Sequence, residues 1–367
     1  MTISKNTRYK QRFKITLTAS LCVLFLVLTT TLCLPANASS TSTGNIQTTS
    51  TDAFNKHGNL LITDQFNNRV IEVSPLTKHI VWSFGSGDPT LCNPGPSSVI
   101  GTNDAERIDG GFTLIAGTGI PSGASSFMPN GCVDNRVIVV NDEGKIVWQY
   151  GRAGVTGSGP NMLNVPVFAI QLPNHHFLIT DQGNNRIIEV NQTKQVVWSY
   201  GPTSGPGALN NPNSAELLTN GHILIADENN NRAIEINHDG KIVWQVSNGL
   251  QTVAFASRLQ NGDTLIVDSG HSRILEINSD KKVVFQYFTN TSPQSNSSPL
   301  PSNAVKLENG NISIADQFNN RVIIIDQNKH IVFQYGMTNV IGNGTNQLDA
   351  PYTGYVIGDY TGQTPPP

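Results

Sequence analysis

The segment 174–201, NHHFLITDQGNNRIIEVNQTKQVVWSYG, is one of several similar segments, and this repetition decides the fold. Close copies lie at 57–85, 220–247, 261–288 and 309–336. A sixth, degenerate copy begins at Gly110 with GGFTLIAG, is interrupted by an insertion and resumes at Asp134 with DNRVIVVNDEGKIVWQYG. The repeat arginine recurs 41 to 67 residues apart, as Arg69, Arg136, Arg186, Arg232, Arg273 and Arg321. Such self-similarity indicates one supersecondary unit used six times.

Each copy contains three short runs rich in Ile and Val, with turn residues between them, which is typical of three β-strands. A fourth run precedes every copy but the first and places an alanine at one position, as Ala105, Ala169, Ala215, Ala256 and Ala304. Four strands per repeat are typical of a propeller blade. The run that the first copy lacks matches residues 348–357. We therefore predict an all-β fold over residues 57–360, a closed six-bladed β-propeller of four-stranded blades whose first blade is completed by the C-terminal strand.

The run from Asp181 to Arg186, Asp-Gln-Gly-Asn-Asn-Arg, resembles the core of the NHL repeat. The same pattern recurs at 64–69, 227–232 and 316–321, and in a weaker form at 268–273. In the second repeat Gly117 stands at the acid position, and Asp134-Asn-Arg136 follows after the insertion. The Gly-Lys-Ile-Val-Trp sequences are also similar to repeats of bacterial arylsulfotransferase-type propellers. The resemblance covers about residues 57–357 and implies a fold, but no particular activity, because propellers host many functions.

The Asp and the Arg of each motif lie five residues apart, at the end of one expected strand and the start of the next. An arginine fork can bind a carboxylate and nearby carbonyl groups together. We interpret the pairs as structural clips, because a specific ligand rarely needs a ring of symmetric arginines. The predicted pairs are Asp64–Arg69, Asp181–Arg186, Asp227–Arg232, Asp268–Arg273 and Asp316–Arg321.

Residues 1–38 resemble a secretory signal peptide, with five basic residues, no acid, an apolar run and an Ala-Asn-Ala cleavage site. The alternative is an uncleaved membrane anchor, since residues 15–34 are uncharged and just long enough to span a bilayer. We expect a flexible Ser/Thr-rich spacer over 39–56 and a disordered tail over 361–367. The protein is thus expected to be secreted or extracytoplasmic, and attached to a membrane only if the N-terminal segment stays uncleaved.

Removal of residues 1–38 would leave 18 basic and 26 acidic residues, a net charge of −8. This charge argues against a nucleic-acid partner, which requires clustered Lys and Arg. The sequence contains no P-loop, G-x-S-x-G, H-E-x-x-H or EF-hand motif. We therefore predict no cofactor, no metal site and no catalytic residue.

The candidate ligand-binding residues are Arg107, Arg258, Lys306, Arg152 and His271. The first three share one position on the expected innermost strands, so we expect them near the central channel. Either they pair with Glu106 and Glu216, because buried charge is costly alone, or they form an anion or water site. Arg152 lies in a Gly-rich connection between blades. His271 is the one histidine expected in a loop between the second and third strands of a blade, on the face where propeller ligands usually bind.

Cys92 and Cys132 are the only cysteines beyond residue 38, and an exported chain meets oxidising surroundings. With the strands of a blade lettered A to D from the axis outward, Cys92 lies in a D–A loop and Cys132 in the B–C insertion of the second blade. These loops share one face, so we predict a disulfide that closes a loop of about 40 residues and contributes roughly 3–4 kcal/mol. The bond would mark this rim as the binding surface.

Two functions follow from these features. The first is an exported binding module that holds a protein, peptide or glycan through the face with the D–A and B–C loops. The second is a propeller-type enzyme, a lyase, a lactonase or an arylsulfotransferase-like protein, with a site at the channel mouth. The absence of a catalytic motif favours the binding module.

Overall fold

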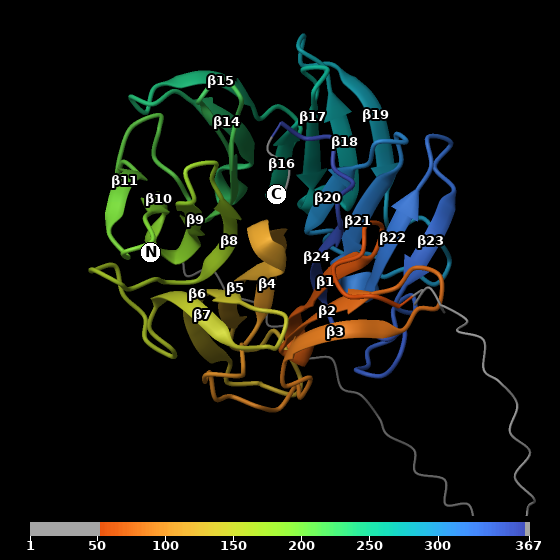
Figure 1. Ribbon diagram of the computed structural model, residues 1–367. Helices are drawn as coiled ribbons and strands as arrows, with labels where there is room; N and C mark the ends of the chain where they lie inside the picture. The colour runs from red at the N-terminus through yellow and green to blue at the C-terminus, as the bar shows by residue number, and fades with distance from the viewer. Residues whose placement is uncertain (1–51, 364–367) are drawn as a thin grey trace, which may run out of the picture. The chain divides into compact units, whose positions relative to one another are not determined.

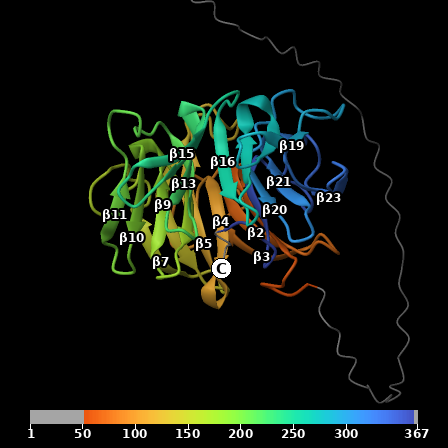
Figure 2. The same cartoon turned by 90° about the horizontal axis from the view of Figure 1, so that it is seen from above.

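The computed structural model describes residues 52–363, which form six four-stranded antiparallel sheets arranged as the predicted closed propeller (Figure 1). Figure 2 shows these sheets, the blades, standing side by side. From the axis outward, blades one to three comprise β24 (Pro351–Val356), β1 (Leu60–Asp64), β2 (Arg69–Val73) and β3 (Ile80–Gly85); β4 (Thr102–Ile108), β5 (Phe112–Ile120), β6 (Cys132–Val140) and β7 (Ile146–Gly151); and β8 (Pro166–Gln171), β9 (Phe177–Asp181), β10 (Arg186–Val190) and β11 (Val196–Tyr200).

Blades four to six repeat the same order of strands. They comprise β12 (Pro212–Leu217), β13 (Ile223–Asp227), β14 (Arg232–Ile236) and β15 (Ile242–Val246); β16 (Val253–Arg258), β17 (Thr264–Asp268), β18 (Arg273–Ile277) and β19 (Val283–Phe288); and β20 (Asn303–Lys306), β21 (Ile312–Asp316), β22 (Arg321–Ile325) and β23 (Ile331–Tyr335). The cores of the blades are Ile, Val and Leu side chains, most of them less than a tenth exposed. The apolar alternation of the strands thus buries the faces on which neighbouring blades pack.

The C-terminal strand closes the ring. β24 pairs antiparallel with β1, with Val356 opposite Leu60 and Tyr355 opposite Leu61. The residue before β24 binds the sixth blade, where the backbone N–H of Ala350 donates to Asn320 Oδ1 at 2.9 Å. The prediction that the first blade is built from both ends of the chain is confirmed.

Each Asp-x-x-Asn-Asn-Arg motif forms one turn of 3₁₀ helix between strands B and C. The turns are η1 (Gln65–Asn67), η3 (Gln182–Asn184), η4 (Glu228–Asn230), η5 (Ser269–His271) and η6 (Gln317–Asn319), and a further turn, η2 (Asp109–Gly111), links β4 and β5. The second Asn has a left-handed backbone, as at Asn231 with φ of 52°. Asn tolerates this conformation better than most residues do. Its side chain then binds the next blade, where Thr252 N–H donates to Asn231 Oδ1 at 2.7 Å. The motif therefore fixes both a turn and the contact between adjacent blades.

The second blade keeps this geometry with a different residue. Gly117 stands where other blades have Asp, and a Cβ atom there would lie 2.9 Å from Asp134 Oδ2. The Asp134 carboxylate fills this space and accepts the Ile100 N–H at 2.7 Å. In the third blade Asp181 makes the corresponding bond to the Asn164 N–H, at 2.8 Å. In the degenerate repeat, Asp134 on strand C thus supplies the carboxylate that an aspartate at the end of strand B supplies in the other blades.

Two predicted boundaries need correction, because short pieces beyond the blades are bound to them. Phe54, assigned to the flexible spacer, packs against Trp82 with ring centroids 5.9 Å apart. In the predicted tail, Thr361 N–H donates to Lys306 O at 3.0 Å and Gln363 N–H donates to Arg258 O at 2.7 Å. These hydrogen bonds and the aromatic contact offset the entropy cost of ordering a terminal segment. The predicted signal peptide, most of the spacer and residues 364–367 lie outside the described residues.

Candidate functional site

The central channel is filled by side chains from opposite blades. Tyr352 of the first blade accepts a hydrogen bond from Asn213 Nδ2 of the fourth blade at 2.7 Å. One layer further along, the rings of Phe168 and Phe255, from blades three and five, lie 5.8 Å apart. These blades are not neighbours, so both contacts cross the axis. The channel therefore offers no open passage at these two levels.

Three carboxyl groups lie within the filled channel. Asp104, Glu106 and Glu216 are each 4% exposed or less. Burial raises the pKa of Asp104 to about 7 and that of Glu216 to about 8. Burial, followed by repulsion from Asp104 and Glu216, holds the pKa of Glu106 well above its usual range. These carboxyls therefore retain protons at pH values where exposed carboxyls are ionised.

The segment after β24 runs past the innermost strands of other blades (Figure 1), at the ends of these strands that lead into the A–B turns. Tyr360 OH donates to Glu216 Oε1 at 2.8 Å and lies 2.7 Å from Ser257 Oγ. The Gln363 side chain accepts a hydrogen bond from Thr219 Oγ1 at 3.0 Å. This segment, residues 357–363, is a strap that ties the first blade to blades four, five and six and shields the carboxyls from solvent.

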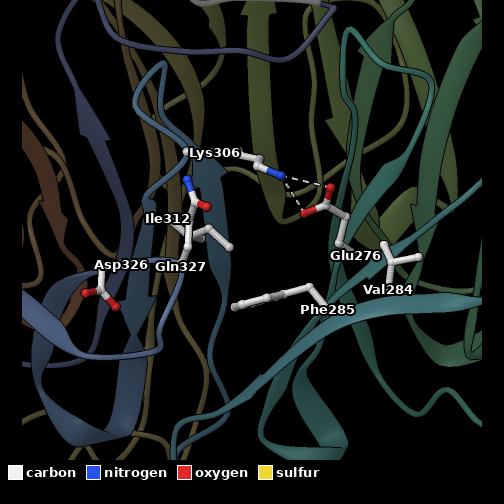
Figure 3. Close-up of a pocket in the computed structure, with 8 residues that line it drawn as sticks. Glu276, Val284, Phe285, Lys306, Ile312, Asp326 and Gln327 are labelled. Atoms are coloured by element: carbon white, nitrogen blue, oxygen red, sulfur yellow. Dashed lines mark hydrogen bonds and ion pairs between the residues drawn. The ribbon is translucent and has the colours of Figure 1, made fainter.

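The three predicted channel cations lie elsewhere. Each points away from the axis and pairs with a glutamate on strand C of the preceding blade, as Arg107–Glu72 at 2.6 Å, Arg258–Glu235 at 3.0 Å and Lys306–Glu276 at 2.7 Å. Successive residues of a strand face opposite sides, so a cation next to an axial glutamate must face the neighbouring blade. The expected pairing with Glu106 and Glu216 is therefore wrong, and the anion or water site stays a prediction. Figure 3 shows the Lys306–Glu276 pair.

The clip arginines bind their predicted aspartates through Nε. The distances are 2.8 Å for Arg69, 2.7 Å for Arg186 and Arg232, 2.6 Å for Arg273 and 2.8 Å for Arg321. The remaining nitrogens of Arg232 donate to the carbonyls of Pro206 and Ala208 in the D–A loop, at 2.8 and 2.9 Å. The guanidinium nitrogens of this arginine are thus bonded to groups of the protein itself.

The two remaining candidates have different surroundings. His271 Nδ1 lies 2.9 Å from Asp268 Oδ2. It replaces an asparagine that binds the same carboxylate oxygen in other blades, such as Asn230 with Asp227 at 2.8 Å. His271 is therefore part of a clip, whereas Arg152 is exposed on the connection between blades two and three.

The structural role of the clips predicts a graded loss of stability. Arg136, whose side chain is 2% exposed, pairs with Asp134, whereas the Arg186 side chain is 22% exposed. Arg136→Met should lower the free energy of unfolding by about 3 kcal/mol, because both partners of this ion pair are buried and water cannot replace the arginine. Arg186→Met should cost about 1 kcal/mol. Urea denaturation measures both, and equal losses would contradict the dependence on burial.

The predicted disulfide is confirmed. Cys92 and Cys132 are bonded, with Cα atoms 5.7 Å apart. The bond joins the loop after β3 to the first residue of β6, where the insertion that follows β5 ends. A pocket of about 440 Å³ lies beside it, between this insertion and the connection from blade two to blade three, and none of its lining residues carries a charge. A disulfide is typical of proteins outside the cytoplasm.

The sequence places Glu106 and Glu216 near the channel only as possible partners of the cations, and it does not single out Asp104. Glu106 and Glu216 each directly follow the repeated alanine of strand A, one residue before the position of the interblade cations. Period-two alternation could have assigned them to the axis. Between residues 52 and 363, no group of three or more His, Cys, Asp and Glu could hold a metal ion. No helix within this stretch is long and apolar enough to cross a membrane.

Comparison with solved structures gives distant matches, of which the first has a similar fold. A protein of unknown function from Bacteroides caccae matches with a TM-score of 0.57 and 16% identity, covering 82% of this chain and 98% of its own. A catalytically inactive virginiamycin B lyase from Staphylococcus aureus, solved with quinupristin, gives 0.49 and 12%, over 81% and 88%. A streptogramin B lyase gives 0.46 and 14%, over 68% and 70%. At these identities the likeness concerns the fold alone.

Comparison with sequences is more specific. No curated protein matches the chain. The model of one family, described as outer membrane protein assembly factor BamB, matches residues 133–355. This match runs from β6 into β24 and covers more than half of the chain. The chain therefore belongs to the BamB family of repeat propellers.

Proposed function

We propose that the protein is an exported binding module that holds an uncharged, extended segment of a partner protein at the disulfide rim. The observation that carries this proposal is the uncharged pocket of about 440 Å³ beside Cys92–Cys132. Val133, 42% exposed, and Ile120 line it. A preformed apolar pocket with a few polar groups is the usual setting for recognition. The disulfide holds the insertion in place, which lowers the entropy cost of binding.

The filled channel argues for a rim site and against catalysis at the axis. Tyr352 and Tyr360 occupy two levels of the channel, and the carboxyls between them are buried. A substrate would have to displace these side chains. The family, named for a factor in outer membrane protein assembly, is in keeping with a protein partner. The Asp-x-x-Asn-Asn-Arg motif also resembles NHL repeats. Its polar groups are bonded within the fold, so the motif supports the propeller and leaves partner binding to the rim.

A charge placed in the pocket tests the proposal. A displayed library of random peptides is selected against the protein, and affinities are measured for the wild type and for Val133→Lys. We expect enriched peptides with an apolar, uncharged centre and at least about tenfold weaker binding to the variant, because the new ammonium must be desolvated. Val197→Lys is the matched control, since Val197 is 50% exposed on β11, away from the pocket.

Two results would overturn the proposal. Peptides that bind both lysine variants like the wild type would show that the rim pocket is not their site. A selection that enriches no peptide, together with saturable binding of a displayed glycan at the rim, would identify a glycan as the ligand.

A further inference from the structure

The six repeats create equivalent grooves between adjacent blades, on the face opposite the disulfide rim. In two of them an indole bridges the groove to the C–D turn of the next blade. Trp82 Nε1 donates to Asp142 O at 2.9 Å, and Trp148 Nε1 donates to Gln192 O at 3.0 Å. The outer-strand aromatic of one blade therefore closes the space beside its neighbour.

The groove between blades five and six is open. Its aromatic is Phe285, which sits opposite Glu276 as Trp82 sits opposite Glu72. Phenylalanine is smaller than tryptophan and has no N–H, and the Lys329 ammonium of the sixth blade lies 5.4 Å from the centroid of the Phe285 ring. A pocket of about 340 Å³ lies here, with Phe285 and Gln327 among its walls. Gln327 holds the repeat position of Asp142 and Gln192.

An ion pair forms one side of this pocket. Lys306 Nζ donates to both carboxylate oxygens of Glu276, at 2.8 and 2.7 Å. The Lys306 side chain is 25% exposed. In Figure 3 this pair and the Gln327 side chain surround the space beside Phe285. A partly exposed ammonium next to an aromatic wall is suited to an aromatic ligand.

The groove between blades one and two shows how such a site is filled. It contains the corresponding ion pair, Arg107–Glu72, and Phe54 from the segment before the first blade packs there beside Trp82, with ring centroids 5.9 Å apart. The Arg107 guanidinium lies 4.3 Å from the centroid of the Phe54 ring. Asn59 Nδ2 binds the carbonyl of Ala53 at 2.8 Å and Glu72 Oε1 at 2.6 Å, so the segment is held by its backbone as well.

We propose that the open groove binds an aromatic side chain of a peptide segment from a partner protein, as the first groove binds Phe54. The ring lies against Phe285 and over Lys306, whose charge remains balanced by Glu276. This site is independent of the disulfide rim. Its volume lies within the range of about 300–1,000 Å³ that is usual for ligand pockets.

The test uses a peptide copied from the chain, acetyl-Asp-Ala-Phe-Asn-Lys-amide, and a second peptide with Ala in place of Phe. Binding to the full chain is followed through the methyl NMR signals of Val284 and Ile312, which line the pocket. We expect saturable shifts with the Phe peptide and at least about tenfold weaker binding of the Ala peptide. Lys306→Met should weaken binding of the Phe peptide several-fold.

Phe285→Ala keeps the test independent of the ion pair. Loss of the aromatic wall should weaken binding of the Phe peptide at least about tenfold, because the ligand ring loses the surface against which it packs. Phe333→Ala, the same change one groove further on, is the control and should leave binding intact. No saturable shift, shifts that are unchanged in Phe285→Ala, or shifts produced by methyl glycosides but not by the Phe peptide would each overturn the proposal.

Discussion

Deletion of residues 348–367 is expected to abolish the stable monomer. β24 would be lost, so the edge of β1 at Leu60–Asp64 would be exposed. The first blade would also lose its link to the sixth, including the bond from Ser302 Oγ to Tyr352 O at 2.6 Å. An open apolar edge is a template for aggregation. Size-exclusion chromatography and thermal unfolding should show aggregated protein without a cooperative transition.

Deletion of residues 358–367 is the matched control, because it keeps β24 and removes only the strap. This variant should remain a monomer with a lower melting temperature, since the bonds of Tyr360, Thr361 and Gln363 are lost. If the longer deletion melts like the full chain, the ring is not closed by the C-terminal strand.

Glu216→Gln is expected to stabilise the protein at high pH and to have little effect at low pH. Burial raises the pKa of Glu216 to about 8, above its value in the unfolded chain. Below about pH 4 the carboxyl is protonated in both states and costs nothing. As the pH rises from there towards 8 the unfolded chain releases the proton first, so the wild type loses stability.

The expected size of this effect follows from the shift. One pKa unit corresponds to about 1.4 kcal/mol, so the wild type loses up to about 5 kcal/mol that the glutamine variant keeps. Gln can still accept the hydrogen bond from Tyr360. Urea denaturation at pH 4 and pH 9 measures the difference, with Glu106→Gln as a companion. A variant less stable than the wild type at pH 9 would contradict the prediction and indicate that a bound cation compensates an ionised carboxylate.

The blades, their strand order and the ring closure could be predicted because they depend on local pattern. Alternating Ile and Val set the strands, and the Asp-x-x-Asn-Asn-Arg motif set the turns between strands B and C. The match of residues 348–357 to the innermost strands assigned the last strand to the first blade. The disulfide followed from topology, because two loops over adjacent blades on one face brought Cys92 and Cys132 together.

The partners of the charged residues could not be predicted in the same way. The sequence located Arg107, Arg258 and Lys306 on the innermost strands, yet their glutamates come from the preceding blades. A pairing across blades depends on strand register and on which face of the strand a side chain occupies. A shift of one residue along an innermost strand moves a side chain from the channel axis to the interface between blades.

The sequence by itself determined a closed six-bladed propeller and its repeated clips, because each of these is a short-range pattern used six times. Only the tertiary structure decided where the six repeats make different contacts, at the channel and in the grooves between blades. The channel is closed because Tyr352, Phe168 and Phe255 reach across the axis. The groove at Phe285 retains a pocket because no side chain equivalent to Phe54 packs beside the ring, which has only the Lys329 ammonium over it. These outcomes depend on the volume left between residues far apart in the chain, which no local pattern specifies.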